Sequence, residues 1–415
     1  MTDNLRILYS SNAFWAKSGY GVQGLSLLPR LAELSEIGGR DNIAQFAWYG
    51  SQGGMHNVEG FQVYPAGTDA YGGDIIGSHT RHFEADIVIT LIDAWVCKGT
   101  GEKVKPALWL PWLPVDHYPV PPKVIDAIQD AFLPLSYSKW GHALLKSQGV
   151  ENRYLPHGLE TSAYKILEAD KVEGFKQNYL KHQGHITIMV AANKGYPDRK
   201  ALGAQIMAWA EFAKDKPDCI LYVHTEPTPL YGGLNLPALT KLLGVGDRVF
   251  FPDRYENFLG MSSEYLSYIY NSANIMMACS RSEGFGIPII ESQACGTPVI
   301  TSNFSSMPEL IQYGTILEPS HLNFTQFDVF DSYPDQKAIT LTLEENYQEW
   351  IDRGKTKDLE ASQKAMEKIH AEYDWDLLVQ KHWQPLMTEL YNQVKKPSIA
   401  VDYVEPKKGK IVPCN

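Results

Sequence analysis

Apolar runs alternate with amphipathic segments along most of this chain. Short runs of isoleucine, leucine and valine, bounded by glycine, proline or polar residues, are typical of buried strands. The first half contains such runs at residues 5–9, 43–49, 87–92 and 107–113. Between the first two, residues 22–34 repeat leucine at helical intervals. Strands that alternate with helices predict a parallel sheet.

A second alternating series follows a polar helical stretch and begins with a predicted strand at 186–191. Later, 273–278 reads as a buried strand, a helix begins at Pro288 and stops near Gly296, and 299–301 reads as the next strand. The first series ends around Leu155-Pro-His-Gly-Leu159. We therefore predict an α/β protein with two domains that meet near residue 165.

Two stretches carry weaker patterns. The glycine-rich, aromatic stretch 50–82 shows little periodicity and predicts loops with short strands. A last helical segment, 375–394, places its leucines and a tryptophan on a roughly common face. The tail, 395–415, contains prolines and five lysines and is predicted to be loosely ordered.

Composition agrees with two full cores. The chain has 415 residues, of which 44% are hydrophobic and 20% are charged, as in ordinary globular proteins. No apolar stretch approaches the length of a membrane span, and the first residues lack the apolar region of a signal peptide. These features predict a cytoplasmic protein without a transmembrane segment.

Charge and cysteine content narrow the partners. A formal charge of −11 argues against an extended nucleic-acid surface and against strong attraction to anionic lipid. Five cysteines occur without a Cys-x-x-Cys pair, so neither a zinc site nor a disulfide framework is indicated. Small molecules or glycans are the expected partners, and the oligomeric state stays open.

The most informative segment is Ser282-Glu-Gly-Phe-Gly-Ile-Pro-Ile-Ile-Glu291, which sets two glutamates eight residues apart around a glycine-containing turn. The free amides of Gly286 and Ile287, with the positive end of the following helix dipole, favour a phosphate. Glu291 could accept hydrogen bonds from ribose hydroxyls, and Glu283 could face a sugar attached to the diphosphate. Acidic residues also complement helix dipoles without any ligand, but the whole pattern favours a nucleotide-sugar site.

This segment, together with Ala294-Cys-Gly-Thr-Pro-Val-Ile300 and Pro308-Glu-Leu310, resembles the Glu-x7-Glu signature of retaining glycosyltransferase family 4 (group 1), which has the GT-B fold. The resemblance implies two Rossmann-like domains with parallel sheets facing across a cleft. The acceptor-side domain would span 1–165 and the nucleotide-sugar-binding domain 166–375. It also implies that a helix at about 376–394 crosses back onto the first domain.

The resemblance implies a set of donor-binding residues. They are Gly19, Gly21, Asn193, Arg199, Lys200, Gly284, Phe285, Gly286, Ile287, Pro288 and Glu291. Lys200 matches the family's phosphate-binding lysine, whereas Asn193 stands where the family usually has an arginine. Arg199 or Lys194 would then supply the second charge. The alternative is a solvated charge pair at a helix start.

The glycine loop Gly19-Tyr-Gly-Val-Gln-Gly24 also matches the Gly-x-Gly-x-x-Gly fingerprint of dinucleotide sites. Its first glycine comes too late after the strand, and no acidic residue follows the next strand, so a dehydrogenase is disfavoured. In the family, this loop closes over the donor. The alternative is a helix start capped by Ser18.

On the first domain, Asp116 and His117 follow a predicted strand and would lie on the cleft rim. The resemblance implies that one of them contacts the donor sugar, which gives a catalytic set of Glu283, His117 and Asp116, while a structural role in a proline-rich loop is the alternative. Asp93 is a further cleft candidate. The Asp374-Trp-Asp376 motif precedes a helix and reads as a cap rather than a metal site.

Together these features predict a retaining, metal-independent glycosyltransferase without a cofactor, which moves a sugar from a UDP- or GDP-sugar to a hydroxyl acceptor. Two alternatives stay open. A nucleotide-sugar epimerase or hydrolase could use the same cleft, and a non-catalytic glycan-binding descendant could retain the fold. The sequence leaves the sugar, the base and the acceptor open.

Overall fold

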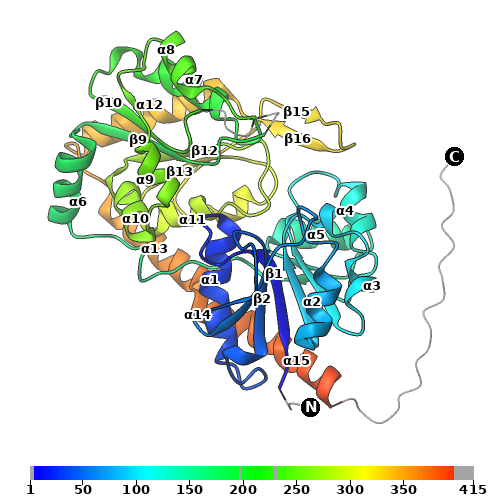
Figure 1. The fold of residues 1–415 in the computed structure, drawn as a ribbon. Helices are drawn as coiled ribbons and strands as arrows, with labels where there is room; N and C mark the ends of the chain where they lie inside the picture. Colours follow the sequence, from blue (N-terminus) through cyan, green and yellow to red (C-terminus); the bar gives the residue numbers. More distant parts are fainter. Residues whose placement is uncertain (1–3, 196–197, 229–231, 397–415) are drawn as a thin grey trace, which may run out of the picture.

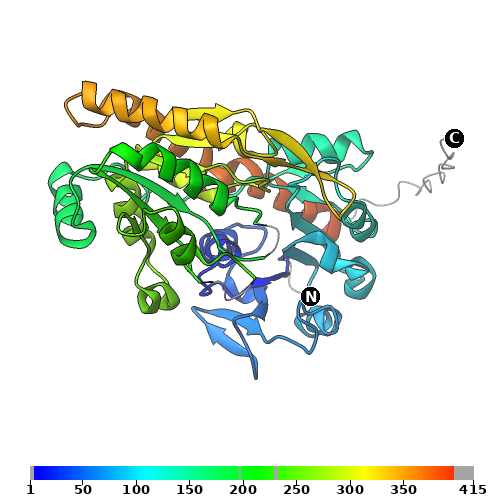
Figure 2. The same cartoon turned by 90° about the horizontal axis from the view of Figure 1, so that it is seen from above.

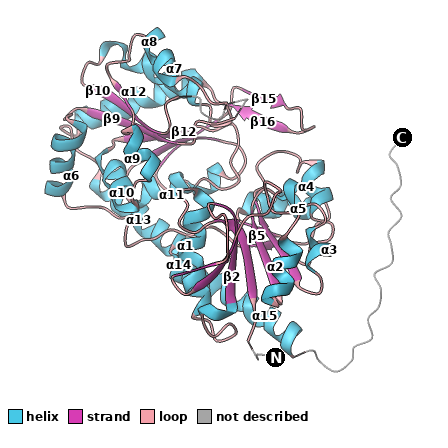
Figure 3. Cartoon of the chain, in the orientation of Figure 1, coloured by secondary structure: helices cyan, strands magenta, loops and turns pink. Residues whose placement is uncertain are grey.

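The computed structural model describes residues 4–195, 198–228 and 232–396. Within these ranges the chain forms two α/β domains, each built on a parallel sheet with helices on both faces (Figures 1 and 3). The predicted tail beyond Lys396 lies outside the described residues, as does Cys414. The other cysteines have free, buried thiols.

The first sheet contains eight described strands in the order β3-β4-β2-β1-β5-β6-β7-β8. They are β1 (Ile7–Asn12), β2 (Ile43–Tyr49), β3 (His56–Val58), β4 (Phe61–Tyr64), β5 (Ile87–Leu91), β6 (Leu108–Leu113), β7 (Leu135–Ser136) and β8 (Arg153–Tyr154). Apart from the antiparallel pair β3 and β4, all neighbours are parallel. Parallel strands are buried on both faces, which explains their near-continuous apolar runs.

The second sheet has the order β11-β10-β9-β12-β13-β14 among the described strands, and every pair is parallel. These strands are β9 (His185–Val190), β10 (Cys219–His224), β11 (Val249–Phe250), β12 (Ile275–Ala278), β13 (Val299–Ser302) and β14 (Gly314–Leu317). A hairpin of β15 (His321–Phe324) and β16 (Phe330–Tyr333) follows.

Helices cover both sheets. The first domain has α1 (Gly19–Ala32), α2 (Ile76–Phe83), α3 (Thr100–Val104), α4 (Pro122–Ala127) and α5 (Lys139–Ser147). The second has α6 (Ala169–Phe175), α7 (Leu202–Phe212), α8 (Leu236–Leu242), α9 (Arg254–Leu259), α10 (Ser263–Ser272), α11 (Ile287–Ala294), α12 (Gln336–Asp352) and α13 (Leu359–Tyr373). Helices α7 and α12 lie side by side over one face of the second sheet (Figure 2).

The last described segment of the chain packs against the first domain. Helices α14 (Trp375–Leu378) and α15 (Gln384–Lys395) flank a π-helical turn, η6 (Val379–Trp383), and α15 lies beside the first sheet (Figure 1). The Trp383 ring meets Trp112 of β6 edge to face, with centroids 5.2 Å apart. Lys395 Nζ lies 2.9 Å from an oxygen of Asp86. The domain limits near 165 and 375 stay predictions.

An aromatic junction cluster joins the two domains. It consists of Trp112, Tyr137, His157, Phe285 and Tyr373, whose rings are in contact. The ring centroid of His157 lies 4.2 Å from that of Tyr137, 4.5 Å from Trp112 and 5.4 Å from Phe285. Because Phe285 belongs to the loop between β12 and α11, this cluster places that loop against the first domain.

The stretch 50–82 differs in part from the prediction. It contains the short strands β3 and β4, as expected, but it ends in helix α2, which periodicity did not indicate. Helix α1 begins at Gly19 rather than near Val22. No helix within the described ranges has the length and apolar character needed to span a bilayer.

Candidate functional site

The loop between β12 and α11 carries the central carboxylate. The predicted order of strand, loop, helix and strand across 273–301 is confirmed. Gly286 precedes α11 with φ +110°, a backbone conformation that favours glycine, and Pro288 lies in the first turn. The side chain of Ser305 accepts a hydrogen bond from the Glu283 amide at 3.0 Å. Glu283 is therefore held at the edge of the sheet where the strands end.

Two cations converge on Glu283. The Lys200 Nζ lies 2.5 Å from Oε1 of Glu283, and Arg199 Nη1 lies 3.4 Å from Oε2. Ser280 Oγ donates to Oε1 at 2.7 Å. Burial alone would raise the pKa of Glu283, but the charges of Lys200 and Arg199 outweigh it and lower the pKa below its ordinary value. The carboxylate is 12% exposed and stays ionised.

The basic pair comes from the loop between β9 and α7. Arg199 Nη1 donates to the carbonyl of Ser282 at 2.7 Å, which ties it to the same loop as Glu283. Asn193 does not join this cluster. Its amide nitrogen donates to the carbonyls of Glu226 and Leu234, at 2.9 and 2.8 Å, so both donors hold a neighbouring loop. The geometry thus favours Arg199 as the second charge.

The first domain supplies Asp116 and His117 from the segment after β6. His117 Nδ1 lies 2.6 Å from Asp116 Oδ1. Burial alone would lower the pKa of His117, but the hydrogen bond and charge of Asp116 raise it. Burial opposes ionisation of Asp116, yet its pKa is lowered by His117 and, at longer range, by Arg199 and Lys200. Charged groups from the two domains therefore lie close enough together to influence one another's ionisation.

The glycine loop adopts the capped helix start. Ser18 Oγ accepts from the Gly21 amide at 3.1 Å, which confirms the predicted cap. A Cβ on Gly21 would lie 2.2 Å from the carbonyl oxygen of Ala16, so no other residue fits without movement. A Cβ on Gly19 would approach Ile287 of α11 within 3.9 Å. The loop therefore reaches the donor-side helix, and its contact with a donor stays a prediction.

Glu291 occupies a different environment. Its carboxylate accepts a 2.7 Å hydrogen bond from Tyr270 Oη and is 8% exposed. Burial raises its pKa above the ordinary value, even though hydrogen bonds from Tyr270 and Tyr164 lower it. The structure therefore brings Glu283, but not Glu291, to the basic pair.

Sequence reasoning missed two contacts that shape the cleft. Arg281 Nη2 and Asp331 Oδ2 lie 2.7 Å apart, both less than one-tenth exposed, and fix β16 to the loop before Glu283. Phe330 of β16 then exchanges backbone hydrogen bonds with Tyr118, next to His117. Partners that lie 50 residues apart, as Arg281 and Asp331 do, or more than 200 apart, as Tyr118 and Phe330 do, leave no signal in a single sequence.

Glu309 also joins the domains, because its carboxylate accepts from the amides of Lys139 and Trp140 at 2.8 and 2.9 Å. It satisfies free amides at the start of α5 across the domain boundary. Asp374 accepts from the amides of Asp376 and Leu377, so the predicted helix cap is confirmed. The described residues contain no group of three or more His, Cys, Asp or Glu side chains placed to hold a metal ion.

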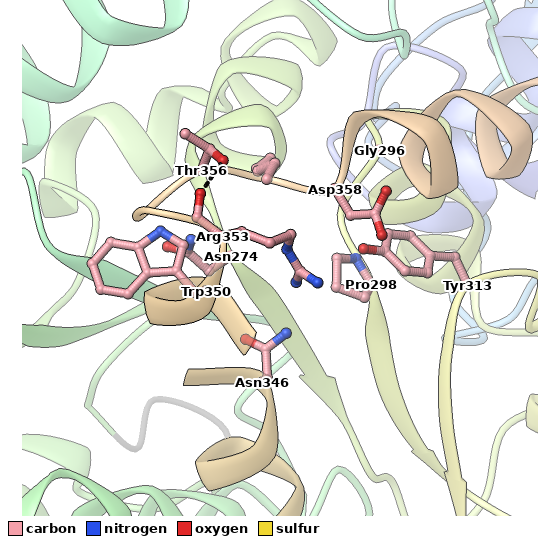
Figure 4. A pocket seen from close by; sticks show the side chains of 10 residues that line it. Asn274, Gly296, Pro298, Tyr313, Asn346, Trp350, Arg353, Thr356 and Asp358 are labelled. Carbon is pink, nitrogen blue, oxygen red and sulfur yellow. Dashed lines mark hydrogen bonds between the residues drawn. The ribbon is translucent and has the colours of Figure 1, made fainter. Parts of the chain in front are cut away.

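A small cavity lies elsewhere, at the amino-terminal edge of the second sheet (Figure 4). Asn274, Pro298, Trp350 and Asp358 contribute to its wall. Its volume of about 10 Å³ gives room for about one water molecule, far less than a nucleotide sugar needs. The candidate site is therefore the cluster of cations and carboxylates around Glu283 rather than this cavity.

The match to a known sequence family lies within the second domain. The family described as Glycosyl transferases group 1 matches residues 235–326. O-antigen chain mannosyltransferase B of Escherichia coli is 32% identical over 107 residues, which are 25% of this chain and 27% of that protein. A D-inositol 3-phosphate glycosyltransferase of Mycobacterium sp. (strain KMS) is 37% identical over 81 residues, 19% of this chain and 17% of that protein. The match thus spans at most about a quarter of these relatives' length.

Solved structures extend the likeness to both domains. Sucrose-phosphate synthase from Thermosynechococcus elongatus superposes with a TM-score of 0.68 at 16% identity, covering 94% of this chain and 99% of that one. Anabaena HepE in complex with UDP-glucose gives 0.67 at 13% identity, covering 93% and 100%. These comparisons confirm the resemblance to the group 1 glycosyltransferases over 235–326 and the GT-B fold over nearly the whole chain.

Proposed function

We propose that this protein transfers a sugar from a nucleotide-diphosphate sugar to a hydroxyl acceptor, with retention of the anomeric configuration and without a metal ion. The observation that carries the proposal is the convergence of Lys200 and Arg199 on Glu283 at the start of α11. Two cations beside free helix amides suit a diphosphate. The family match and the UDP-glucose complex of HepE support such a donor.

Electrostatic preorganisation would do most of the chemical work. As the bond between the sugar C1 and the diphosphate oxygen breaks, its electron pair moves to that oxygen, and Arg199 and Lys200 stabilise the added charge. The acceptor oxygen bonds to C1 on the same face. Its proton passes to the departing phosphate oxygen, so no protein base is required.

Glu283 and the pair Asp116–His117 would frame the reacting sugar from the two domains. The lowered pKa of Glu283 keeps it negative beside an oxocarbenium-like centre. The hydrogen bond and charge of Asp116 raise the pKa of His117, which favours its cationic form as a hydrogen-bond donor to the sugar. We place the reaction in the cytoplasm.

The test measures donor binding and then turnover. Thermal stabilisation by UDP, GDP and ADP, and by their glucose, galactose and mannose conjugates, is recorded with and without EDTA, since ligands of the folded state raise apparent stability. We expect one diphosphate to stabilise the protein equally in both conditions. Lys200→Met should lose the shift, and Lys241→Met, at an exposed lysine of α8, should keep it.

Product analysis separates the alternatives. With the stabilising nucleotide sugar, proton NMR of the anomeric region should show a product of the same configuration as the donor only when an acceptor is present. Conversion of donor without an acceptor would identify a hydrolase or epimerase. No stabilisation by any nucleotide would argue for a protein without donor binding.

A further inference from the structure

An aromatic rim lines the cleft edge of the first sheet. It consists of Trp15, Tyr49, Tyr71 and Trp95, whose side chains are 39%, 59%, 42% and 53% exposed. Soluble proteins rarely expose large aromatic groups together unless the patch binds something. None of these four residues belongs to the cation and carboxylate cluster described above.

Topology places the rim residues at one edge. They follow or end the neighbouring parallel strands β1, β2, β4 and β5, whose carboxyl ends share the edge that faces the second domain (Figure 1). In open α/β sheets, ligands bind outside this edge. The rim therefore extends the cleft rather than forming a separate surface.

The rings are contiguous. The Tyr71 ring centroid lies 5.7 Å from that of Trp48 and 6.1 Å from that of Trp95. Trp48 in turn lies 6.4 Å from Tyr49. Trp15 Nε1 donates to the carbonyl of Gly50 at 3.2 Å, which fixes this ring beside the end of β2.

Hydrogen bonds within the loop that carries Tyr71 hold it in place before any ligand binds. Asp69 accepts from the amides of Tyr71 and Gly73 at 2.8 and 3.1 Å. Asp74 accepts from the amide and the hydroxyl of Thr68 at 2.8 and 2.7 Å. A rigid aromatic group loses little conformational entropy when it binds a ligand, which suits a recognition surface.

The inner end of the rim reaches the reaction cleft. Asp93 precedes the short helix η2 (Ala94–Cys97), which carries Trp95. Partial desolvation between the two domains and the charge of Asp116 raise the pKa of Asp93, which remains exposed to solvent, while Arg199 lowers it. One end of a ligand bound to Trp95 would therefore lie beside Asp93, near Asp116 and Arg199.

We propose that the aromatic rim binds the acceptor and that the acceptor is a neutral oligosaccharide. A pyranose ring presents a face of C–H bonds that stacks on an aromatic ring and an edge of hydroxyls that bonds to carboxylates. Trp and Tyr offer such amphipathic surfaces. The Asp69 carboxylate would repel anionic lipid headgroups, and the oxygens of Asp69 and Asp93 would accept hydrogen bonds from hydroxyls, which favours a neutral glycan. The inference rests on the proposed transferase function and names its acceptor class.

Saturation-transfer NMR tests the proposal without donor, using di- to hexasaccharides of glucose, mannose and galactose as probes. We expect ring C–H protons of at least one series to receive saturation. Trp95→Ala and Tyr71→Ala should each weaken its binding by about threefold to tenfold. Trp95→Phe should restore most of it, and Tyr179→Ala, at a tyrosine 67% exposed in the second domain, should change nothing.

Nucleotide stabilisation of each variant is measured in parallel, so that the two proposals fail separately. If nucleotides bind but no oligosaccharide does, the rim proposal is overturned and the donor site stands. If oligosaccharides bind through the rim and no nucleotide binds, the rim stands and the transferase proposal fails. Binding of phosphatidylcholine–phosphatidylglycerol vesicles that is lost in Trp95→Ala would also overturn the rim proposal.

Discussion

Replacement of His157 by phenylalanine should make the protein less sensitive to acid. His157 is 2% exposed within the junction cluster, and burial lowers its pKa from 6.5 to about 3. Its Nδ1 has no hydrogen-bond partner among the described residues. The folded state thus excludes a proton that the unfolded chain binds, and stability must fall as the pH drops from 6.5 towards 3.

The size of this effect follows from linkage. One pKa unit corresponds to about 1.4 kcal/mol, and the two pKa values of His157 predict a loss of about 2 kcal/mol between about pH 7.5 and about pH 5. Phenylalanine keeps an aromatic ring in the cluster and binds no proton. The difference in unfolding free energy between wild type and His157→Phe should therefore shift by about 2 kcal/mol in favour of the variant at the lower pH.

Urea unfolding, followed by tryptophan fluorescence at both pH values, measures this shift. Trp112 contacts His157 and is one of the ten tryptophans that contribute to this signal. Phe285→Leu is the matched control, since it weakens the same cluster without changing a titratable group and should lower stability equally at both values. Equal pH dependence in wild type and His157→Phe would refute the reasoning.

Four further outcomes are expected. Glu283→Gln should reduce turnover at least about a hundredfold, by analogy with other lost electrostatic contacts. The variant should bind the free nucleoside diphosphate as tightly as wild type or more tightly, because a carboxylate no longer competes for the two cations. Product assays measure the turnover, and calorimetry measures the binding. Arg281→Met should destabilise the protein by about 3–5 kcal/mol in urea melts, since it leaves Asp331 buried without its cation, and Arg281→Met combined with Asp331→Leu should recover much of the loss. Lys357→Met should raise the melting temperature most below pH 7 and less towards pH 10, because burial lowers the pKa of Lys357 to about 7 and the folded state carries its charge only at lower pH. Gly21→Ala should cost about 1–3 kcal/mol in thermal melts, since its methyl group would meet a main-chain oxygen 2.2 Å away.

Local patterns in the sequence predicted the elements that bury apolar runs. Strand β2 was predicted at its observed limits, and the strand, loop and helix around Glu283 follow directly from Gly286 and Pro288. Helix α2 was not predicted, because its eight residues include Ser, Thr, Arg and two His. Only its ends, Ile76 and Phe83, are large and apolar. Its helical state depends on packing against the first sheet rather than on periodicity.

The site was predictable in part for the same reason. Glu283, Arg199 and Lys200 stand in local motifs, and the structure brings them together. The separation of Glu291 from this cluster could not be predicted, because it depends on Tyr270 from another helix. Glu309 likewise acts on a helix 170 residues away, a distance over which sequence pattern carries no geometry.

The return of α15 to the first domain has a consequence for the order of folding on the ribosome. Strand β8 ends at Tyr154, whereas Gln384 begins α15 about 230 residues later. At roughly 5–20 residues per second, synthesis of the intervening chain takes about 10–45 s. The second sheet and its helices through α13 emerge in one continuous stretch during that interval. Until Trp383 is synthesised, the surface of the first domain around Trp112 would therefore stay uncovered. The second domain, although it is synthesised later, would complete its fold first.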